Sequence, residues 1–592
     1  MRATNTAMTA SVDIASTSGT LAGPLMARAS STTRGQPVAL AVGLVVVLLV
    51  LVVPPLFVLI QSSLLTQADP DHWSLENFAA ILGSRRFLAT LWYSVQFSAG
   101  SAAFALLLGW SAAWLAERTN TPLRSLAYLT AIMSLGTPFI LYVSAWLLFF
   151  GKAGPINQLY RELTGHVDVL FNIYSMPGMI VVEGFLWSPF AFLLVGATLR
   201  NANPDLEEVA RVSGASVWQT VKRVTLRQSL PSIMALAMLV FIRTMEAFEV
   251  PALVGMPGRL FVLTTDIYSS MAAKSPPDTG GASALSIIML LLVLVLLYVY
   301  GRLSRNAERF VTVTGKNFRA RPFDLGRFRY VATALLAMNF ILLIVVPIAT
   351  LIWISLLPFF QPFSIKALSL LTLDNYRNVL ASAYVDLAIN TLSMSFGAAT
   401  VATFITLLAA WVVVRRATGG WLIERLTLIP LIFPGLILGL AVMELFLQIP
   451  LPLYGTLFVL IWAFVINYLP YSMRYTTSGL LQIHPELEEA ATICGASSLT
   501  IMRLILAPLI APALLAGWLF IFLMSSRVLS LAILLAGPRT QPVSVAMYDL
   551  WNNGQGTELA ALGLMWSALM TAIAMIFYLV TRRFSGGLLG QA

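Results

Sequence analysis

The sequence predicts an all-α polytopic membrane protein with about twelve transmembrane helices, arranged as two homologous halves of six helices each. Three observations support this fold class. First, 58% of the 592 residues are hydrophobic and 10% are charged, whereas soluble proteins carry roughly 25% charged residues. Second, the apolar residues gather in long runs. Third, the polar stretch "DLEEVARVSGAS", which starts at Asp205, returns as "ELEEAATICGAS", which starts at Glu486.

The apolar runs are long enough to cross a bilayer. Residues 38–60, for example, contain no charged side chain, and about 20 apolar residues span the hydrocarbon core as a helix. Helices are expected because lipid offers the backbone no hydrogen-bond partners. Twelve runs centre near residues 50, 100, 138, 187, 240, 292, 342, 400, 437, 466, 522 and 570. Gly and Pro residues interrupt the third, fourth and ninth runs.

Basic residues between the runs predict the orientation in the membrane. The segment after the sixth run carries Arg302, Arg305, Arg309, Lys316, Arg319, Arg321, Arg327 and Arg329. The arginine pairs at 415–416 and 582–583 fall on the same side, whereas the opposite loop at 64–83 has acidic residues and no basic ones. Since cytoplasmic loops are enriched in Lys and Arg, both termini should be cytoplasmic. This topology explains the net charge of +10 without a nucleic-acid partner.

The tail, the cysteine and the histidines suggest no further chemistry. Residues 1–37 are rich in Ala, Ser and Thr, which predicts a disordered cytoplasmic tail. The tail is too long and polar for the n-region of a cleaved signal peptide. A single cysteine, Cys494, cannot form an intrachain disulfide, and His72, His166 and His484 are far apart. No Cys/His group has metal-ligand spacing, so we expect no metal site and no cofactor.

The sequence predicts that the chain is a tandem repeat. Residues 203–231 align with residues 484–512 without a gap. Earlier in each half, "SLENFAAIL" (74–82) resembles "TLDNYRNVL" (372–380), and "AAWLAER" (112–118) resembles "AAWVVVR" (409–415). The predicted organisation is therefore a first six-helix domain at 38–303, a basic cytoplasmic linker at 304–328 and a second six-helix domain at 329–585. An even number of spans per half makes the repeat parallel, with its pseudo-twofold axis along the membrane normal.

Each polar repeat predicts a short helix, a sharp turn and a second short helix on the cytoplasmic side. Proline at 204 or 485 suits a helix start, and the acidic pair after it suits the positive end of the helix dipole. Gly214 and Gly495 permit the left-handed backbone of a helix stop. Two such elements at equivalent places in a duplicated fold favour docking to a paired partner over mere connecting loops.

The second polar repeat resembles the cytoplasmic EAA loop of the permeases of binding-protein-dependent ABC importers. That pattern is Glu-Ala-Ala, three residues, Gly, nine residues, Ile, one residue, Leu-Pro. The second copy fits it at Glu489, Ala490, Ala491, Gly495, Ile505 and Pro508, with Ala507 in place of Leu. The first copy is looser: it fits at Glu208, Ala210, Gly214 and Leu226, and it departs at Val209, Val224 and Arg227.

The resemblance implies two halves of the type I ABC importer permease fold. Two such halves fused in one chain are similar to the bacterial ferric-iron permeases and the thiamine permeases. The resemblance further implies two copies of an ATPase subunit at the cytoplasmic loops, a periplasmic binding protein at the other face, and the bacterial inner membrane as the location. The implied coupling residues are Glu207, Glu208, Ala210, Gly214, Glu488, Glu489, Ala490, Ala491 and Gly495. Residues 248–271 and 530–555 look more like the iron-type group, so ferric iron is the expected substrate, ahead of thiamine, polyamines or phosphonates.

Two other classes of function compete with this interpretation. A membrane enzyme is disfavoured, since the sequence has no GxxxxGK[ST], HExxH or GxSxG pattern in a suitable context. The missing phosphate-binding loop also assigns ATP hydrolysis to a separate protein. A secondary transporter of the facilitator type would share the twelve spans in two parallel halves. However, the loop at 117–125 lacks the Gly/Asp/Arg-rich signature of that group, and duplicated polar loops have no role in its mechanism.

Ionisable residues at membrane depth are candidates for a substrate pathway, because each costs about 2.5–3.5 kcal/mol to insert. A structural ion pair, or a position nearer the interface, is the alternative for each of them. The candidates are Glu183, Arg243, Glu246, Glu249, Glu444 and Arg527. The repeat register places Glu246 opposite Arg527, which predicts an ion pair across the pseudo-twofold axis. Arg243 offers Glu246 an intrahelical i,i+3 pair instead, and the sequence leaves both pairs open.

Overall fold

The computed structural model describes residues 35–66, 72–201, 205–308, 322–361, 363–381, 384–415 and 419–589. Nearly all of the predicted tail, the middle of the basic linker, Pro204 and Arg416 lie outside these residues. Within them the regular elements are helices, and Thr119 and Phe323 form an isolated parallel β-bridge. The predicted all-α fold class is confirmed.

The first half runs from α2 to α13. Its elements are α2 (Gly35–Leu64), α3 (Glu76–Leu82), α4 (Arg85–Arg118), α5 (Ser125–Gly136), α6 (Phe139–Phe150), α7 (Pro155–Thr164), α8 (Met176–Asn201), α9 (Asp205–Val212), α10 (Val217–Thr220), η1 (Val221–Thr225), α11 (Leu226–Met245), η2 (Pro251–Gly255), α12 (Leu263–Ala272) and α13 (Thr279–Glu308).

The second half repeats this order with local changes. Its elements are α14 (Phe328–Phe340), η3 (Ile341–Val345), α15 (Val346–Ser355), η4 (Lys366–Leu370), α16 (Asp374–Ala381), α17 (Tyr384–Val414), α18 (Gly420–Leu428), η5 (Ile429–Ile432), α19 (Gly435–Gln448), α20 (Leu457–Leu480), α21 (Glu486–Ile493), α22 (Ser498–Ile501), η6 (Met502–Leu506), α23 (Ala507–Leu509), α24 (Ala511–Ser525), α25 (Val543–Asn552) and α26 (Gly556–Leu589).

The number of spans agrees with the twelve predicted runs. Ten helices in the described residues are long and apolar enough to cross a membrane, and the number is twelve when each of two bent helix pairs is counted as one span. One pair, α18–η5 with α19, bends by 106° just before Gly435, at the ninth run, which the sequence marks as interrupted. The fourth run is different, because α8 continues through Pro189. The eleventh run is bent by 76° before α24, a break that the sequence analysis did not anticipate.

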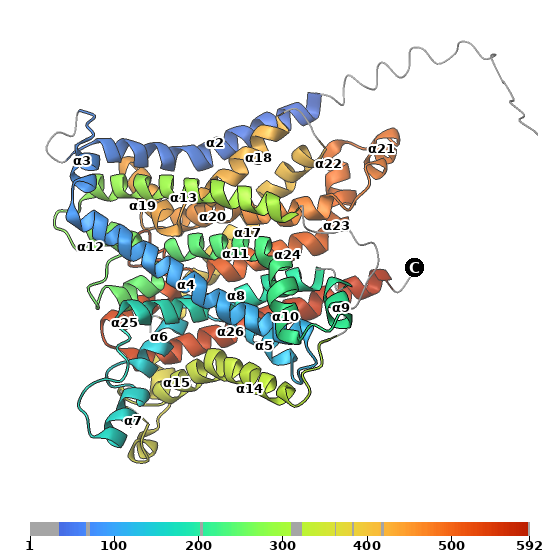
Figure 1. Ribbon diagram of the computed structural model, residues 1–592. Helices are drawn as coiled ribbons and strands as arrows, with labels where there is room; N and C mark the ends of the chain where they lie inside the picture. Colours follow the sequence, from blue (N-terminus) through green and yellow to red (C-terminus); the bar gives the residue numbers. More distant parts are fainter. Residues whose placement is uncertain are drawn as a thin grey trace, which may run out of the picture.

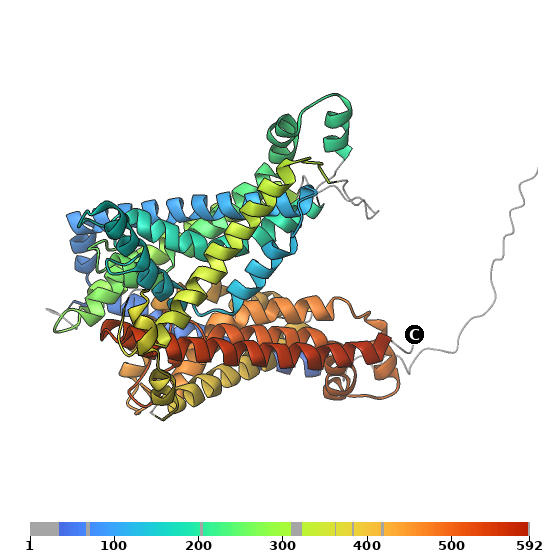
Figure 2. The ribbon, with the colours of Figure 1, turned by 90° about the horizontal axis from the view of Figure 1, so that it is seen from below.

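The polar repeats and the short linking helices lie at opposite ends of the bundle. Figure 1 shows α9, α10, α21 and α22 at the end where the described chain finishes, whereas α3, α7, α12 and α25 lie at the other end. We call these the polar-loop end and the outer end. Figure 2 shows that the two polar repeats, although at the same end, lie on opposite sides of the molecule.

The two halves interlock through their first spans. Helix α2 packs on α13 of its own half and also on α18 and α19 of the second half. In the reciprocal arrangement, α15 packs on α26 of its own half and on α6 of the first half, and α14 packs on α5. Leu48 and Leu59 of α2 are fully buried as a result. Each half therefore completes the helical surface of the other.

Small residues set the closest helix contacts. The contact between α4 and α8 is the most extensive in the molecule, and α17 and α20 form its counterpart in the second half. A side chain at Gly109 would meet the backbone of Phe192 at 2.7 Å, and one at Gly397 would meet Ile461 at 2.8 Å. Glycine at such points lets helix backbones approach closely, which is how helices associate in lipid.

The repeat also extends to the hydrogen bonds that end the first span of each half. The Asn77 amide donates to the carbonyl oxygens of Ser63 and Leu65. The Asn375 amide donates to the carbonyl oxygens of Ser355 and Leu357 in the same way. These asparagines occupy matching places in the "SLENFAAIL" and "TLDNYRNVL" stretches. They satisfy carbonyl groups that a helix end leaves without partners.

Candidate functional site

The polar repeats form the predicted helix–turn–helix elements, which we call the first polar loop (205–220) and the second polar loop (486–501). Helix α9 carries Asp205, Glu207 and Glu208 in its first turn, and α21 carries Glu486, Glu488 and Glu489. The helices stop before Gly214 and Gly495, whose φ angles of 81° and 86° are left-handed. Ser216 and Ser497 then cap the next helix through their hydroxyl groups.

One acidic residue of each polar loop is fixed to the end of the second span of its half. In the second half, Arg415 lies 2.5 Å from Glu488, and the Trp411 indole donates to the same carboxylate at 2.9 Å. In the first half, Arg118 lies 3.7 Å from Glu207, and Thr225 donates to Glu207 at 2.6 Å. Arg118 and Arg415 close the repeated "AAWLAER" and "AAWVVVR" stretches. We call these two pairs the Arg–Glu latches.

The rest of each polar loop faces outward. Glu208, Gly214, Glu489, Ala490 and Gly495 are exposed, and Ala210 and Ala491 are half-buried. Apolar side chains at matching positions are also exposed: Val212 and Trp218 in the first loop are 85% and 72% exposed, and Ile493 and Leu499 in the second are 87% and 75% exposed. Exposed apolar residues at two equivalent places favour contact with another protein.

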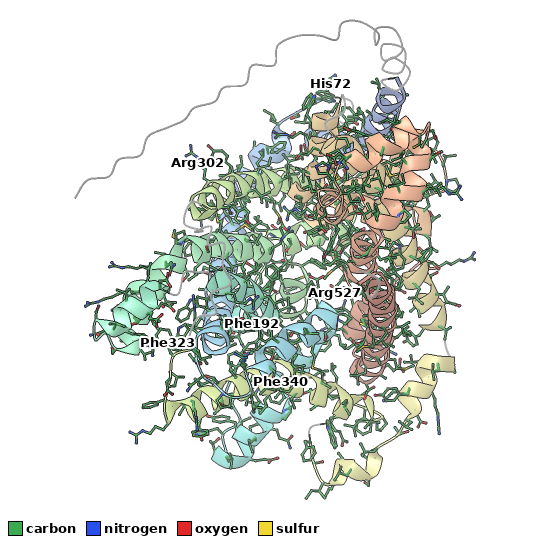
Figure 3. The ribbon with its side chains drawn as sticks, turned by 90° about the vertical axis from the view of Figure 1, so that its right-hand side faces the viewer. His72, Phe192, Arg302, Phe323, Phe340 and Arg527 are labelled. Atoms are coloured by element: carbon green, nitrogen blue, oxygen red, sulfur yellow. The ribbon has the colours of Figure 1, made fainter. Side chains whose placement is uncertain are left out.

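The end of the linker between the halves touches the first polar loop. The buried Phe323 exchanges backbone hydrogen bonds with Arg118 and Asn120, and the Arg211 guanidinium of α9 lies 5.3 Å from the Phe323 ring centre. Figure 3, viewed from the polar-loop end, places Phe323 near the edge of the molecule. Hydrogen bonds from the Gly326 backbone and the Asn120 amide lower the pKa of Asp324. This segment braces the first polar loop.

Five of the six candidate pathway residues gather in the middle of the bundle. Glu183 accepts a hydrogen bond from the Trp187 indole at 2.9 Å and interacts electrostatically with Glu249. The Glu249 carboxylate lies beside the backbone of Leu529 and Ser530 in the second half. Because these contacts cross between the halves, the cluster lies at their junction.

The arginines of this central cluster also bridge the halves. Arg243 pairs with Glu246 at 2.9 Å, the intrahelical pair of the two that the sequence left open. The same guanidinium donates to the Tyr471 hydroxyl of α20 at 2.9 Å. Arg527 lies 4.3 Å from the ring centre of Phe139 and interacts with Glu249. Figure 3 places Arg527 in the interior, between the two halves. Arg527 therefore interacts with Glu249 of the first half.

Glu444 lies apart from the central cluster. Its carboxylate accepts a hydrogen bond from the Ser283 hydroxyl at 2.6 Å, which joins α19 of the second half to α13 of the first. The side chain is 5% exposed. This geometry suits the alternative that the sequence analysis kept for each candidate, a structural contact between helices.

Two equivalent tyrosines meet at the outer end. Tyr268 and Tyr548 are each the sixth residue of α12 and α25, and their ring centres are 6.4 Å apart. Phe248 lies 5.2 Å from Tyr268 and 6.5 Å from Tyr548. The backbone N–H groups that begin α12 and α25 donate to Ser94 and Thr391, each at 2.9 Å. The second span of each half therefore holds one side of an aromatic contact between the halves.

The comparison with protein families identifies the fold. Residues 105–309 and 402–589 each match the family described as "Binding-protein-dependent transport system inner membrane component". The chain belongs to this family. Since the match occurs once in each half, the protein is a tandem permease subunit of an ABC importer, a multi-pass membrane protein, as the polar loops indicated.

Two curated relatives are similar over most of the chain. The chain is 24% identical over 521 residues to "Ferric transport system permease protein FbpB" of Actinobacillus pleuropneumoniae, covering 86% of this chain and 73% of that one. It is 28% identical over 585 residues to "Probable ABC transporter permease protein y4fN" of Sinorhizobium fredii, covering 94% and 98%. A solved bacterial ABC transporter for the import of alginate matches 48% of this permease and all of the compared chain, with 19% identity and a TM-score of 0.39.

The sequence analysis missed both the latch partners and the outer tyrosines. Arg118 and Arg415 appeared only as the ends of a repeated stretch and as loop charges. Tyr268 and Tyr548 lie in stretches that were compared only for their family resemblance. In each case the sequence did contain a clue to these contacts, because the same residue type stands at equivalent positions of both halves.

The Arg–Glu latches predict how the second polar loop opens. Arg415→Gln leaves the Glu488 carboxylate with fewer partners, and losing one side of a largely buried charge pair costs about 1–3 kcal/mol. Hydrogen exchange of the amides at 486–493 should therefore accelerate about tenfold or more. The double variant Arg415→Gln/Glu488→Gln should exchange more slowly than the sum of the single effects implies.

Arg503→Gln is the matched control, because Arg503 is an exposed arginine close to the same loop. It should leave exchange at 486–493 unchanged. Equal exchange rates in Arg415→Gln and the unaltered protein would show that the ion pair does not hold the loop.

Proposed function

We propose that this permease moves a substrate inward by alternating access, with two copies of a separate ATPase docked on the two polar loops. The observation that carries the proposal is duplication: both loops keep an outward acidic and apolar surface while an Arg–Glu latch ties them to a transmembrane helix. A periplasmic binding protein delivers the substrate to the outer end. The protein itself is not an enzyme, and ATP hydrolysis belongs to its partner.

The proposed transmission runs along the second span of each half. When the ATPase subunits close on ATP, they draw the polar loops toward each other. The latches pass this movement to α4 and α17, whose outer ends carry the hydroxyl groups that hold α12 and α25. Separation of Tyr268 from Tyr548 then opens the outer end. In this topology the polar-loop end, with both termini, faces the cytoplasm of a bacterium, and the protein lies in the inner membrane.

Ferric iron is the substrate that we propose. The support comes from relatives named as ferric transport permeases. Within the described residues no three acidic, histidine or cysteine side chains are placed to hold a metal ion, so the central cluster offers a passing cation single carboxylate and phenol oxygens. Hard cations favour such ligands. Arg243 and Arg527 balance part of this negative charge. A cation is then bound more weakly, which suits its passage through the permease rather than its permanent retention. A polyamine is the second candidate, because "Spermidine/putrescine transport system permease protein PotB" of Salmonella typhimurium is 25% identical over 44% of this chain.

Charge reversal in the polar loops should release the ATPase. Glu489→Lys places a positive charge where the proposed docking surface has a negative one. Gly495→Asp places a strained side chain at a positive φ angle on the same surface. We expect about tenfold less ATPase to copurify with either variant, a loss of about 1.4 kcal/mol in affinity. Glu208→Lys should act in the same direction at the first loop.

Glu76→Lys is the control for these variants, since Glu76 is an exposed acid of α3 at the outer end. It should copurify normal amounts of ATPase. Normal copurification and transport by Glu489→Lys and Gly495→Asp together would contradict docking at this loop.

The substrate is tested with the complete transporter in proteoliposomes. Binding protein loaded with ferric iron should stimulate ATP hydrolysis above the level seen with iron-free binding protein, and Glu249→Gln should reduce iron uptake more than Glu76→Gln does. Stimulation by a spermidine-loaded or thiamine-loaded binding protein, with no response to iron, would replace the substrate but keep the importer mechanism.

A crosslink at the outer tyrosines should stop transport. Tyr268→Cys/Tyr548→Cys in a Cys494→Ser background joins the two halves at the outer end when treated with a short reducible dithiol-specific reagent. Uptake should cease after crosslinking and return after reduction, while each single cysteine variant stays active under the same treatment. Continued uptake with the crosslink in place would show that the outer end opens elsewhere.

A further inference from the structure

A second kind of site lies at the outer end of the first half, away from both the polar loops and the central cluster. A cavity of about 330 Å³ opens between the start of α4 and the turn that leads into α12. In Figure 1 these two helices approach each other at the outer end. The cavity is lined by Arg86, Ala89, Thr90, Tyr93, Arg259 and Phe261. This lining contains two guanidinium groups, two hydroxyl groups and no carboxylate.

Arg86 is held in place from one side. Its guanidinium lies 2.5 Å from Asp266 of α12 and donates to the Ser269 hydroxyl at 3.3 Å. It also stands 5.4 Å from the centre of the Phe261 ring. The side chain nevertheless remains 58% exposed. Arg86 and Asp266 both line a second, smaller cavity. Asp266 offsets part of the Arg86 charge, so the uncompensated positive charge of the first cavity comes mainly from Arg259.

Arg259 is presented by a strained turn. Its φ angle is 58°, a left-handed conformation that is uncommon for arginine. The preceding Gly258 is closely packed, because an added side chain would meet the carbonyl oxygen of Tyr174 at 2.7 Å. Within the described residues Arg259 has no ion-pair partner. Such strain persists only where the surrounding structure imposes it, and it clusters at binding sites.

The second half repeats this arrangement only in part: Arg539 stands at the position of Arg259 in the register that matches Tyr268 with Tyr548, but Arg86 has no counterpart. In the register that matches "AAWLAER" with "AAWVVVR", Ala383 replaces Arg86, Leu387 replaces Thr90 and Asn390 replaces Tyr93. The Asn390 amide donates to the backbone carbonyl of Arg539 at 2.9 Å. That contact fastens α17 directly to the turn before α25. The first half has an arginine-lined cavity where the second half has a hydrogen bond.

We propose that this cavity binds an oxyanion, a phosphate or carboxylate group, between the guanidinium groups of Arg86 and Arg259. Arginine forms two parallel hydrogen bonds with such groups, and the two hydroxyl-bearing residues add donors. The bound anion joins α4 to the turn before α12, as Asn390 does in the second half. The anion comes from solution or from the headgroup of an anionic phospholipid, which present the same chemistry to the site.

The test uses the full chain, purified in a phosphate-free maltoside detergent and depleted of lipid, so it requires neither the ATPase nor a binding protein. Inorganic phosphate is titrated at constant ionic strength while thermal unfolding is followed. Phosphate should raise the Tm in a saturable way. Arg259→Asn should weaken the apparent affinity about tenfold or more, and asparagine tolerates the positive φ. Arg86→Gln should weaken it as well.

Arg85→Gln is the matched control, because Arg85 is the exposed neighbour on α4 that does not line the cavity. It should keep the response of the unaltered protein. A parallel titration with phosphatidylglycerol, followed by native mass spectrometry, separates the two sources: retention of lipid that requires Arg259 assigns a headgroup, and a phosphate response alone assigns a free anion. Absence of both responses, or equal responses in Arg259→Asn and Arg85→Gln, overturns the proposal.

Discussion

The exchange of first spans between the halves is the constraint on which the rest of the structure depends. Transmembrane helices gain no hydrophobic energy from leaving lipid for each other, so their association rests on close packing and hydrogen bonds. Helix α2 supplies both halves with such a surface, and α14–α15 do so in return. The Ser283–Glu444 hydrogen bond adds a polar contact across the same junction. If the halves separated, each would lose the contacts with the first span that the other half contributes.

Within that frame, α4 and α17 connect the two functional ends. Each is a long helix, and the 34 residues of α4 extend about 50 Å at 1.5 Å per residue. At one end, an arginine fixes a polar loop. At the other, a hydroxyl group caps the helix that carries Tyr268 or Tyr548. A rigid element with specific partners at both ends can carry movement between two sites, and here the partners recur in both halves.

The two halves share this frame but differ where ligands are proposed to bind. The acids of the central cluster, Glu183, Glu246 and Glu249, all belong to the first half, whereas Arg527 comes from the second. The linker end at Phe323 braces the first polar loop, and the arginine-lined cavity lies in the first half. Fusion into one chain keeps such differences on fixed sides of the pseudo-twofold axis. A pair of identical subunits would have to duplicate each of them.

The sequence by itself determined the all-α class, the twelve spans, the tandem repeat and the position of the polar loops. These features depend on local composition and on residue spacing, and both can be seen directly in the sequence. The Gly214 and Gly495 turns belong to the same group, because a left-handed turn is a property of one residue. The sequence also predicted which charges lie at membrane depth, but it left Glu246 with two possible partners and did not separate Glu444 from the others.

Only the tertiary structure decided which groups meet. It paired Glu246 with Arg243, placed Arg527 beside Phe139 and Glu249, and used one acid of each polar loop for a latch while its neighbour faces outward. It also bent the eleventh span and brought Tyr268 against Tyr548. Each of these outcomes depends on how helices far apart in the chain approach one another. That approach depends on how whole helix faces pack. A repeat register shows which positions of the two halves are equivalent, but it does not show which helix faces touch.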